Sequence, residues 1–316
     1  MFQTWKIRPV LTGLLTWLPL LNAWRQRRAT TGGTDSARYC YSVWLRHLLT
    51  LHRYGFKAKG ARIGELGPGD SIGTGLAALL SGARQYVGLD IVPFSARADL
   101  ITIYDELTQM YFRREPIPDD SEFPRIRPQL NSYDFPHQLL ESVIDGTKVK
   151  TIRNDLERDI NEGFYVNYRA PWSSSKEVAP ASLDLIFSQA VLEHVDDLTA
   201  TYKAMSAWLK SGGYASHVID FRSHGLSPFW NGHWAYSDRE WRMVRGRREF
   251  LLNREPLSVH LSCAAKAGFK VLLLRAEYDD SCGLPTRHLS QRFRAIDTND
   301  FQICGALLIL QKRKPI

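Results

Sequence analysis

The residues that could do chemistry begin with a short string from Glu65 to Ser71, which reads Glu-Leu-Gly-Pro-Gly-Asp-Ser. Its glycines, Gly67 and Gly69, let the backbone turn tightly and approach a ligand without a side chain in the way. A helix that starts after the string would aim free backbone amides at that ligand. Asp90 ends the next expected strand about 20 residues later, where a carboxylate can accept hydrogen bonds from both hydroxyls of a ribose. This spacing predicts a nucleoside cofactor, and a purely structural turn is the alternative.

The same string distinguishes between nucleoside cofactors. The dinucleotide-binding pattern Gly-x-Gly-x-x-Gly requires a third glycine where this chain has Ile72. A pyrophosphate also gains nothing from a carboxylate at Glu65, because like charges repel. S-adenosylmethionine (SAM) carries an amino-acid end and no phosphate. Glu65 can orient its cationic part through bound water, while the helix amides bind its carboxylate. The string therefore favours SAM over NAD.

A second group of chemical side chains surrounds the end of the fifth expected strand. Methyl transfer from SAM is an in-line displacement, and an oxygen acceptor must also lose a proton to a base. His217, Asp220 and His224 are the candidates for that base, with a carboxylate orienting an imidazole. Strand alternation places His217 and Phe221 on one face of the strand and Asp220 on the other. His194, after the fourth strand, either supports the cofactor pocket or is itself a base.

The loop that follows is rich in aromatic and histidine side chains. Its run from Phe229 to Tyr236 reads Phe-Trp-Asn-Gly-His-Trp-Ala-Tyr. We expect the acceptor to be bound by Arg222, Trp230, Asn231 and His233, and a local aromatic core is the alternative. The spacing of the histidines here matches no standard metal site, so no metal is expected.

Short apolar strands that alternate with amphipathic helices position these residues and predict an α/β fold with helices on both faces of a parallel sheet. The expected strands are 62–66, 86–90, 164–168, 183–188, 214–220, 269–274 and 304–311, the last returning as a hairpin partner. Asp70 or Ser71 can cap the helix after the glycine turn. A further helix from Leu198 is expected to stop at Gly212 and Gly213.

Two long connections interrupt this alternation, at about 93–163 and 221–255. Ligands of open parallel sheets bind beyond the carboxyl ends of the strands, from which both connections leave. Connections of this length are usually lids or binding elements. We therefore expect both insertions to grip the acceptor.

Several strings together resemble those of the class I SAM-dependent methyltransferase superfamily, over about 61–274. They are Glu-Leu-Gly-Pro-Gly-Asp from Glu65, Gly-Leu-Asp ending at Asp90, the run Leu183–Val195, Leu-Lys-Ser-Gly-Gly from Leu209 and Ala-Gly-Phe from Ala267. The resemblance implies a Rossmann-like, seven-stranded, mostly parallel sheet. It also implies SAM contacts from Glu65, Gly67, Gly69, Asp90, Ile91, Ser188 and Gln189. One departure is the end of the third strand, where the superfamily often has an acid near the adenine and this chain has none.

Length, composition and net charge limit the classes of protein to which the chain can belong. With 316 residues, of which 44% are hydrophobic, the chain can bury a large core. Its four cysteines are far apart, which argues against a zinc site or a disulfide framework and fits the cytoplasm. The formal net charge is +8, yet we see no RNA-binding motif with interleaved aromatics, so a solvated basic surface is favoured over a nucleic-acid partner.

The first 60 residues are expected to form a helical segment ahead of a domain that spans 61–316. An apolar run at 10–24 lies between Lys6 and Arg8 on one side and basic residues 25–28 on the other. It is too short to span a bilayer and is broken by Pro19. Basic flanks with Trp17 suit a helix that lies in a membrane interface at the inner face, and packing on the domain is an equal alternative.

The function that these observations favour is SAM-dependent O-methylation of a saccharide or of a lipid-linked or small polar acceptor. The strings His-x-x-Asp-x-Arg-x-His and Trp-Asn-Gly-His-Trp resemble those of methyltransferases from surface-polysaccharide pathways. An RNA or protein methyltransferase is the enzymatic alternative, and the lack of an Asn-Pro-Pro-Tyr string after the fourth strand speaks against amino-group methylation. A SAM-binding scaffold without catalysis is the third hypothesis, disfavoured by the intact cofactor string.

Overall fold

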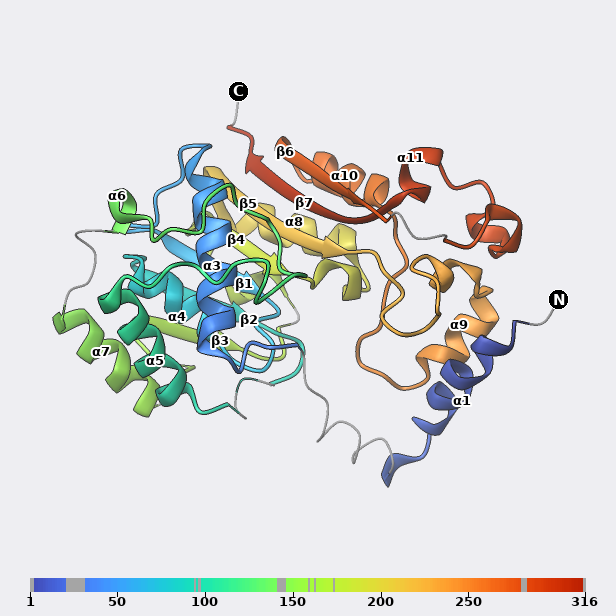
Figure 1. The fold of residues 1–316 in the computed structure, drawn as a ribbon, viewed down its shortest axis with the longest axis horizontal. Coiled ribbons are helices and arrows are strands. Elements are labelled where there is room, and N and C mark those ends of the chain that lie inside the picture. Colours follow the sequence, from blue (N-terminus) through green and yellow to red (C-terminus); the bar gives the residue numbers. More distant parts are fainter. Residues whose placement is uncertain are drawn as a thin grey trace.

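The computed structural model describes residues 3–20, 32–93, 95, 98–140, 146–158, 160–161, 163–172, 174–279 and 283–314. A seven-stranded sheet in the order β3-β2-β1-β4-β5-β7-β6 organises them (Figure 1). The neighbours from β3 through β5 pair in parallel, and β7 runs antiparallel to both β5 and β6. The strands are β1 (Arg62–Leu66), β2 (Gln85–Leu89), β3 (Val166–Arg169), β4 (Leu183–Gln189), β5 (Leu209–Asp220), β6 (Phe269–Tyr278) and β7 (Ile303–Lys312). The predicted Rossmann-like, mostly parallel sheet is confirmed.

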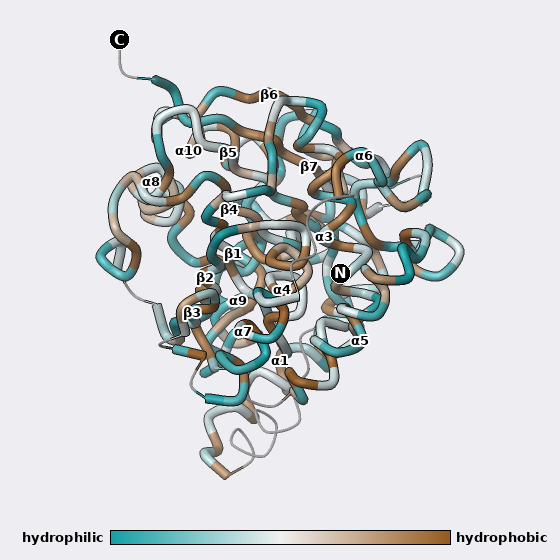
Figure 2. The backbone as a smooth tube through the Cα atoms, turned by 90° about the vertical axis from the view of Figure 1, so that its left-hand side faces the viewer, coloured by the Kyte–Doolittle hydropathy of each residue, from teal (hydrophilic) through white to brown (hydrophobic). Residues whose placement is uncertain are grey.

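The sheet is covered by helices on both faces, which bury separate apolar layers. On one face lie α3 (Ala37–His52), α4 (Gly73–Leu80), α5 (Leu100–Arg113), α6 (His137–Leu140) and α7 (Gly146–Glu157). On the other lie α8 (Leu198–Trp208) and α10 (Leu257–Lys266). The central strands are apolar because both of their faces are buried, and the tube is coloured hydrophobic along much of β7 (Figure 2).

Several predicted element bounds are wrong for local reasons. The third strand begins at Val166, since Phe164 is exposed. The helix after the glycine turn begins at Gly73 with Ile72 at its N-cap position, while Oγ of Ser71, one residue earlier, accepts from the amide of Gly73 at 2.9 Å. The helix from Leu198 ends at Trp208, and the two glycines expected to stop it lie inside β5.

The first 60 residues divide between two places in the molecule. Helix α3 packs on α4 and α5 and is part of the main core. Helix α1 (Ile7–Leu15) instead packs on α9 (Asp238–Arg245), away from the sheet (Figure 1). The close approach requires glycine at Gly13, because an added Cβ would collide with the backbone of Met243. A domain boundary at residue 60 stays a prediction, and the predictions that concern residues 21–31 lie outside the described residues.

The two insertions differ in what they build. The first contributes α5 and α7, whose apolar sides lie in the same layer as α3 and α4. These helices therefore cover one face of the sheet. They do not form the lid that the length of the first connection favoured. The second contributes a 3-10 helix (Gly232–Ala235) and α9, which lie beyond the carboxyl end of β5. Within the described part of the chain, no helix is both long and apolar enough to cross a membrane.

Candidate active site

The glycine turn lies where the sheet order reverses, between β1 and β4. Gly67 and Gly69 have φ angles of +61° and +77°, which glycine adopts without strain. The amide of Gly67 donates to the carbonyl of Leu89 on β2 at 2.8 Å. A Cβ at Gly67 would lie 2.7 Å from Cγ2 of Val191, just after β4. The turn therefore sits at the switch point of the sheet, where open α/β folds bind ligands.

Two buried carboxyl groups flank this turn. The Tyr86 hydroxyl donates to Oε2 of Glu65 at 2.7 Å, and burial raises the pKa of Glu65 to about 8. Asp90 accepts from the amides of Gly69 (3.3 Å) and Ile91 (2.7 Å), and burial raises its pKa to about 6. A cation bound beside them would lower both pKa values, since the nearby positive charge favours the ionised carboxylates. Tyr86 is a contributor that the sequence did not suggest.

These residues fit a cationic nucleoside. The glycines leave a cradle that a Cβ at Gly67 would fill, and the buried acids accept from a hydroxyl and from backbone amides, which carry no positive charge. Ile91 is 43% exposed next to Asp90 and offers an apolar contact for a base. The donor set therefore suits SAM, whose charge is positive at the sulfonium and at the amino group.

The side chains at the end of β4 point into the protein instead of toward the turn. Ser188 is buried, and its Oγ lies 2.8 Å from Nδ1 of His217. Oε1 of Gln189 lies 3.1 Å from Nε2 of His47 on α3, and the other ring nitrogen of His47 lies 2.7 Å from Oγ of Ser216. A cofactor contact at Ser188 or Gln189 would therefore have to come from the backbone.

His217 is fully buried, and its burial lowers its pKa to about 3. The imidazole faces Tyr202 and the layer under α8. This position argues against the predicted role of His217 as a base, because an acceptor cannot reach it. The predicted alternation is confirmed, since Ile219 and Phe221 face that same layer whereas Val218 faces the other.

Asp220 and His224 meet at the carboxyl end of β5. Nε2 of His224 lies 3.3 Å from Oδ2 of Asp220, and the His224 side chain is 29% exposed. Burial raises the pKa of Asp220, but hydrogen bonds from His224 and the Arg222 amide outweigh it and leave the pKa below the ordinary value. His224 has a φ of +47°. A non-glycine residue there is strained by about 1–3 kcal/mol, and such strain clusters at functional sites.

The guanidinium of Arg222 is occupied by ion pairs within the chain. It contacts Oδ1 of Asp220 at 3.2 Å, Oε2 of Glu277 at 3.8 Å and Oδ2 of Asp279 at 3.7 Å. With three carboxylates around it, Arg222 positions the end of β5, and its predicted contact with the acceptor has no direct support.

The aromatic loop forms a local core. This was the alternative to a role of the loop in acceptor binding. Trp230 packs edge-on against Trp234 in a small apolar cluster. Both amide atoms of Asn231 bond to the backbone of Leu284, at 3.0 and 2.7 Å. His233 is buried against Trp234, and burial lowers its pKa to about 3. These side chains face inward, so acceptor binding by Trp230, Asn231 and His233 has no direct support and stays a prediction.

Two residues after β4 join the Asp220–His224 pair. Glu193 and His194 lie in a short 3-10 helix (Leu192–His194). Oε1 of Glu193 accepts from the amide of Asp220 at 3.3 Å, and the His194 ring lies 5.1 Å from the His224 ring. Burial raises the pKa of Glu193 and lowers that of His194 to about 4. Sequence reasoning assigned no role to Glu193, although it directly precedes a histidine at the end of a buried strand.

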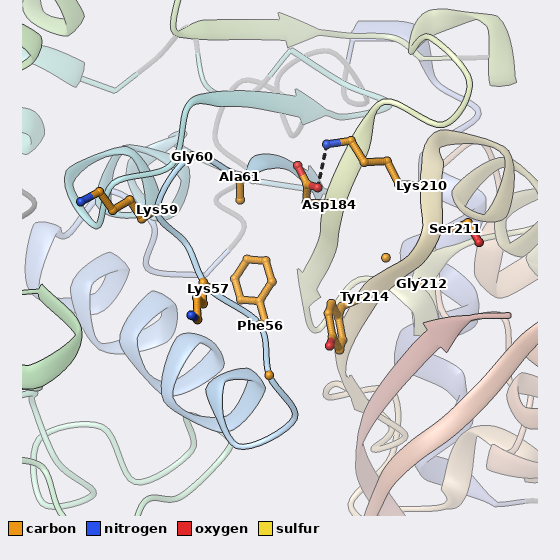
Figure 3. A pocket seen from close by; sticks show the side chains of 12 residues that line it. Phe56, Lys57, Lys59, Gly60, Ala61, Asp184, Lys210, Ser211, Gly212 and Tyr214 are labelled. Atoms are coloured by element: carbon orange, nitrogen blue, oxygen red, sulfur yellow. Dashed lines mark hydrogen bonds and ion pairs between the residues drawn. The ribbon is translucent and has the colours of Figure 1, made fainter. Parts of the chain in front are cut away.

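A surface cavity of about 330 Å³ lies at the other edge of the sheet (Figure 3). It is lined by the segment that precedes β1, which includes Lys57, by Asp184 at the amino end of β4 and by the first residues of β5, which include Lys210. Lys210 is bound to Asp184 at 2.7 Å. The cofactor turn lies at the opposite, carboxyl ends of these strands, so this cavity is separate from the chemistry.

Comparison with known proteins gives a family match over part of the chain. Residues 144–216 match the sequence model described as "Methyltransferase domain". No curated protein matches the chain in sequence.

Similar solved structures include a SAM-dependent methyltransferase from Mesorhizobium loti, with 14% identity, a TM-score of 0.42 and coverage of 84% of this chain and 98% of that one. One from Methanosarcina mazei has 14% identity, a TM-score of 0.44 and coverage of 84% and 98%. A phosphoethanolamine N-methyltransferase from Haemonchus contortus, bound to SAM, has 15% identity, a TM-score of 0.41 and coverage of 86% and 53%. Over residues 144–216 the chain is therefore similar to methyltransferase domains, and its glycine turn and sheet order agree with the resemblance that the sequence shows.

Proposed function

We propose that the enzyme transfers the SAM methyl group to a hydroxyl oxygen of a saccharide, or of a related lipid-linked or small polar acceptor. The observation that carries this proposal is the contact between His224 and Asp220. It provides an exposed imidazole next to a carboxylate at the carboxyl end of β5, two strands away from β1, which the cofactor turn follows. Such a pair suits an acceptor that must lose a proton, as a hydroxyl must.

In this proposal SAM binds over the glycine turn. Gly67 and Gly69 admit it, Asp90 accepts from the ribose hydroxyls, and Ile91 contacts the adenine. Glu65 orients the cationic end, which gives its buried carboxylate the positive partner that favours ionisation. SAM supplies the electrophilic methyl group.

The chain's own contribution at the acceptor is to hold the hydroxyl in line and to take its proton. When Nε2 of His224 carries a hydrogen and donates it to Asp220, the lone pair of the imidazole is on Nδ1. Nδ1 then accepts the hydroxyl proton as the oxygen attacks the methyl carbon and the sulfonium leaves as a neutral thioether. Asp220 stabilises the imidazolium that results.

Methyl transfer from radiolabelled SAM into fractionated cell extract tests the proposal. We expect label in a saccharide or lipid-linked fraction, and we expect His224→Ala to lose it. His288→Ala, which changes an exposed histidine outside the site, is the matched control. Label that ribonuclease or protease removes would support the rival acceptors. SAM binding without transfer to any fraction would support the scaffold hypothesis.

We also propose that the enzyme meets its acceptor at an anionic membrane surface, through the exposed side of α1 and the residues just after it. This α1 surface consists of Ile7, Leu11, Leu14, Leu15, Trp17, Leu18 and Leu20. Leu11 is 55% exposed and Leu20 is 87% exposed. Monomeric proteins rarely expose so many large apolar side chains in one place without a partner.

Basic groups beside this surface favour lipid over a second protein. Arg8, Arg242 and Arg247 are exposed, and the Arg247 guanidinium lies 4.7 Å from the centre of the Trp17 ring. An amphipathic helix with arginines and a tryptophan at its edge is typical of helices that lie in the headgroup region of an anionic bilayer. Helix α1, at nine residues, is suited to lying on the membrane.

Flotation with vesicles that contain anionic lipid tests this part. Burial of a half-exposed leucine is worth about 1 kcal/mol, so the double change Leu11→Asp and Leu15→Asp should weaken binding about 30-fold or more. Phe112→Asp on α5 is the matched control, since Phe112 is similarly exposed elsewhere. Equal binding by both variants, or a wild-type dimer that ignores vesicles, would contradict a lipid partner.

A further inference from the structure

We infer that Glu193, His194 and His224 form a binding site for a divalent transition-metal ion. Each offers one ligand atom, and these three atoms lie within 4.8 Å of one another. The sequence led us to expect no metal site. The three residues follow two neighbouring strands, β4 and β5, and have no regular spacing in the sequence. Binding of the ion does not depend on the proposed acceptor.

The fold presents these three side chains from rigid neighbours. Glu193 and His194 follow β4, and His224 follows β5, which pairs with β4 in parallel. The side-chain amide of Asn253 donates to the carbonyls of Leu192 and Val195 at 2.8 and 2.9 Å, and its backbone amide donates to the carbonyl of Glu193 at 2.7 Å. The second insertion thus fastens the Glu193–His194 segment. Preorganised ligands of this kind favour metal binding.

Two polar atoms of the set are buried without a hydrogen-bond partner among the described residues. They are Oε2 of Glu193, whose residue is 2% exposed, and Nδ1 of His194. Buried polar groups are almost always satisfied, and an exception at a cluster calls for a ligand. A cation that Glu193 and His194 bound through these atoms would satisfy both of them.

The ligand types select the kind of ion. Two imidazoles and one carboxylate suit zinc and its neighbours in the first transition row, whereas magnesium and calcium prefer oxygen ligands alone. Asp220 contacts the His224 ring at Nε2, as carboxylates commonly do behind a metal-bound histidine. Three protein ligands leave a coordination position open for an oxygen atom of water or of an acceptor.

The consequence for catalysis rests on the proposed O-methylation. An ion at this place would bind the acceptor oxygen and lower the pKa of its hydroxyl, whose proton would pass to solvent water. In the loaded enzyme His224 is a ligand, so the ion replaces the imidazole as the group that activates the hydroxyl. Removal of the ion and removal of His224 would then have the same effect on turnover.

Cobalt(II) titration of the full chain, after dialysis against a chelator, tests the site by visible absorption and calorimetry. We expect one cobalt ion per chain, and we expect Glu193→Gln and His194→Ala each to weaken its binding at least about tenfold. His288→Ala should bind as the wild type does. SAM affinity serves as the folding control for every variant.

A wild-type chain that binds no cobalt stoichiometrically would overturn the inference, as would equal affinity in the wild type and both site variants. Glu193→Gln keeps the side-chain shape, so its result stands even where His194→Ala fails to fold. The titration needs no acceptor. Absence of cobalt binding leaves the base mechanism intact, and failure to find a hydroxyl acceptor leaves the metal result intact.

Discussion

Asp90→Asn tests the cofactor site most informatively. The change keeps the shape of the side chain but removes the charge that we expect to accept from the ribose hydroxyls. Hydrogen bonds to a charged group are worth about 1–3 kcal/mol, so SAM affinity should fall about 5- to 150-fold. The single side-chain oxygen of the variant can accept from the Gly69 amide or from the Ile91 amide but not from both, so a change in the turn can add to the loss of affinity.

The raised pKa of Asp90 also predicts how SAM affinity depends on pH. With a pKa of about 6, the carboxyl group is ionised in about one tenth of molecules at pH 5 and in about nine tenths at pH 7. If the ionised form binds SAM, wild-type affinity should rise about tenfold across that interval. Asp90→Asn should remove the rise, because amides do not titrate there.

Calorimetry with SAM at a series of pH values measures both the affinity and its pH dependence. Glu106→Gln is the control, since Glu106 is exposed on α5 and its loss should change neither the affinity nor its pH dependence. A folded Asp90→Asn protein that binds SAM as tightly as the wild type would refute the role of Asp90 in the cofactor site. A pH profile that persists in the variant would refute the assignment of the titration to Asp90.

Further outcomes follow from other residues of the site and its surroundings. Burial raises the pKa of Glu65 to about 8, so affinity for SAM should rise further between about pH 7 and 9, and Glu65→Gln should flatten calorimetric titrations in that interval. His224→Ala should reduce kcat while SAM affinity stays unchanged; normal turnover in labelled transfer would remove it from the site. Asn231→Ala leaves two backbone groups of Leu284 unpaired, so urea unfolding should show a loss of about 1–3 kcal/mol, with no effect on the acceptor KM. A rise in that KM would restore Asn231 to acceptor binding.

The sheet could be predicted from the sequence because its strands are short apolar runs and glycines mark several of the turns between elements. The strands at 62–66 and 183–189 need only burial and β-propensity, and the glycine turn between them needs positive φ, which Gly67 and Gly69 signal directly. Helix stops were harder to place. The pair at Gly212 and Gly213 has the composition of a helix end, yet β5 begins at Leu209, where it pairs with Leu183 of β4.

Roles that depend on tertiary contacts could not be predicted in the same way. The loop with Trp230 and His233 has the composition of a binding surface, and only packing shows that these side chains turn inward. Likewise, Glu193 meets His224 because β4 and β5 are neighbours in the sheet. The spacing of these residues in the sequence does not reveal that the two strands are neighbours, so the spacing of the histidines could not suggest the group of Glu193, His194 and His224.

Titration of the wild-type chain with SAM and, separately, with NAD tests the central claim most directly. We expect one bound SAM per chain, displaced by S-adenosylhomocysteine, and no binding of NAD at the same concentrations. A chain that binds NAD at the turn beside Asp90 and does not bind SAM would contradict the cofactor assignment.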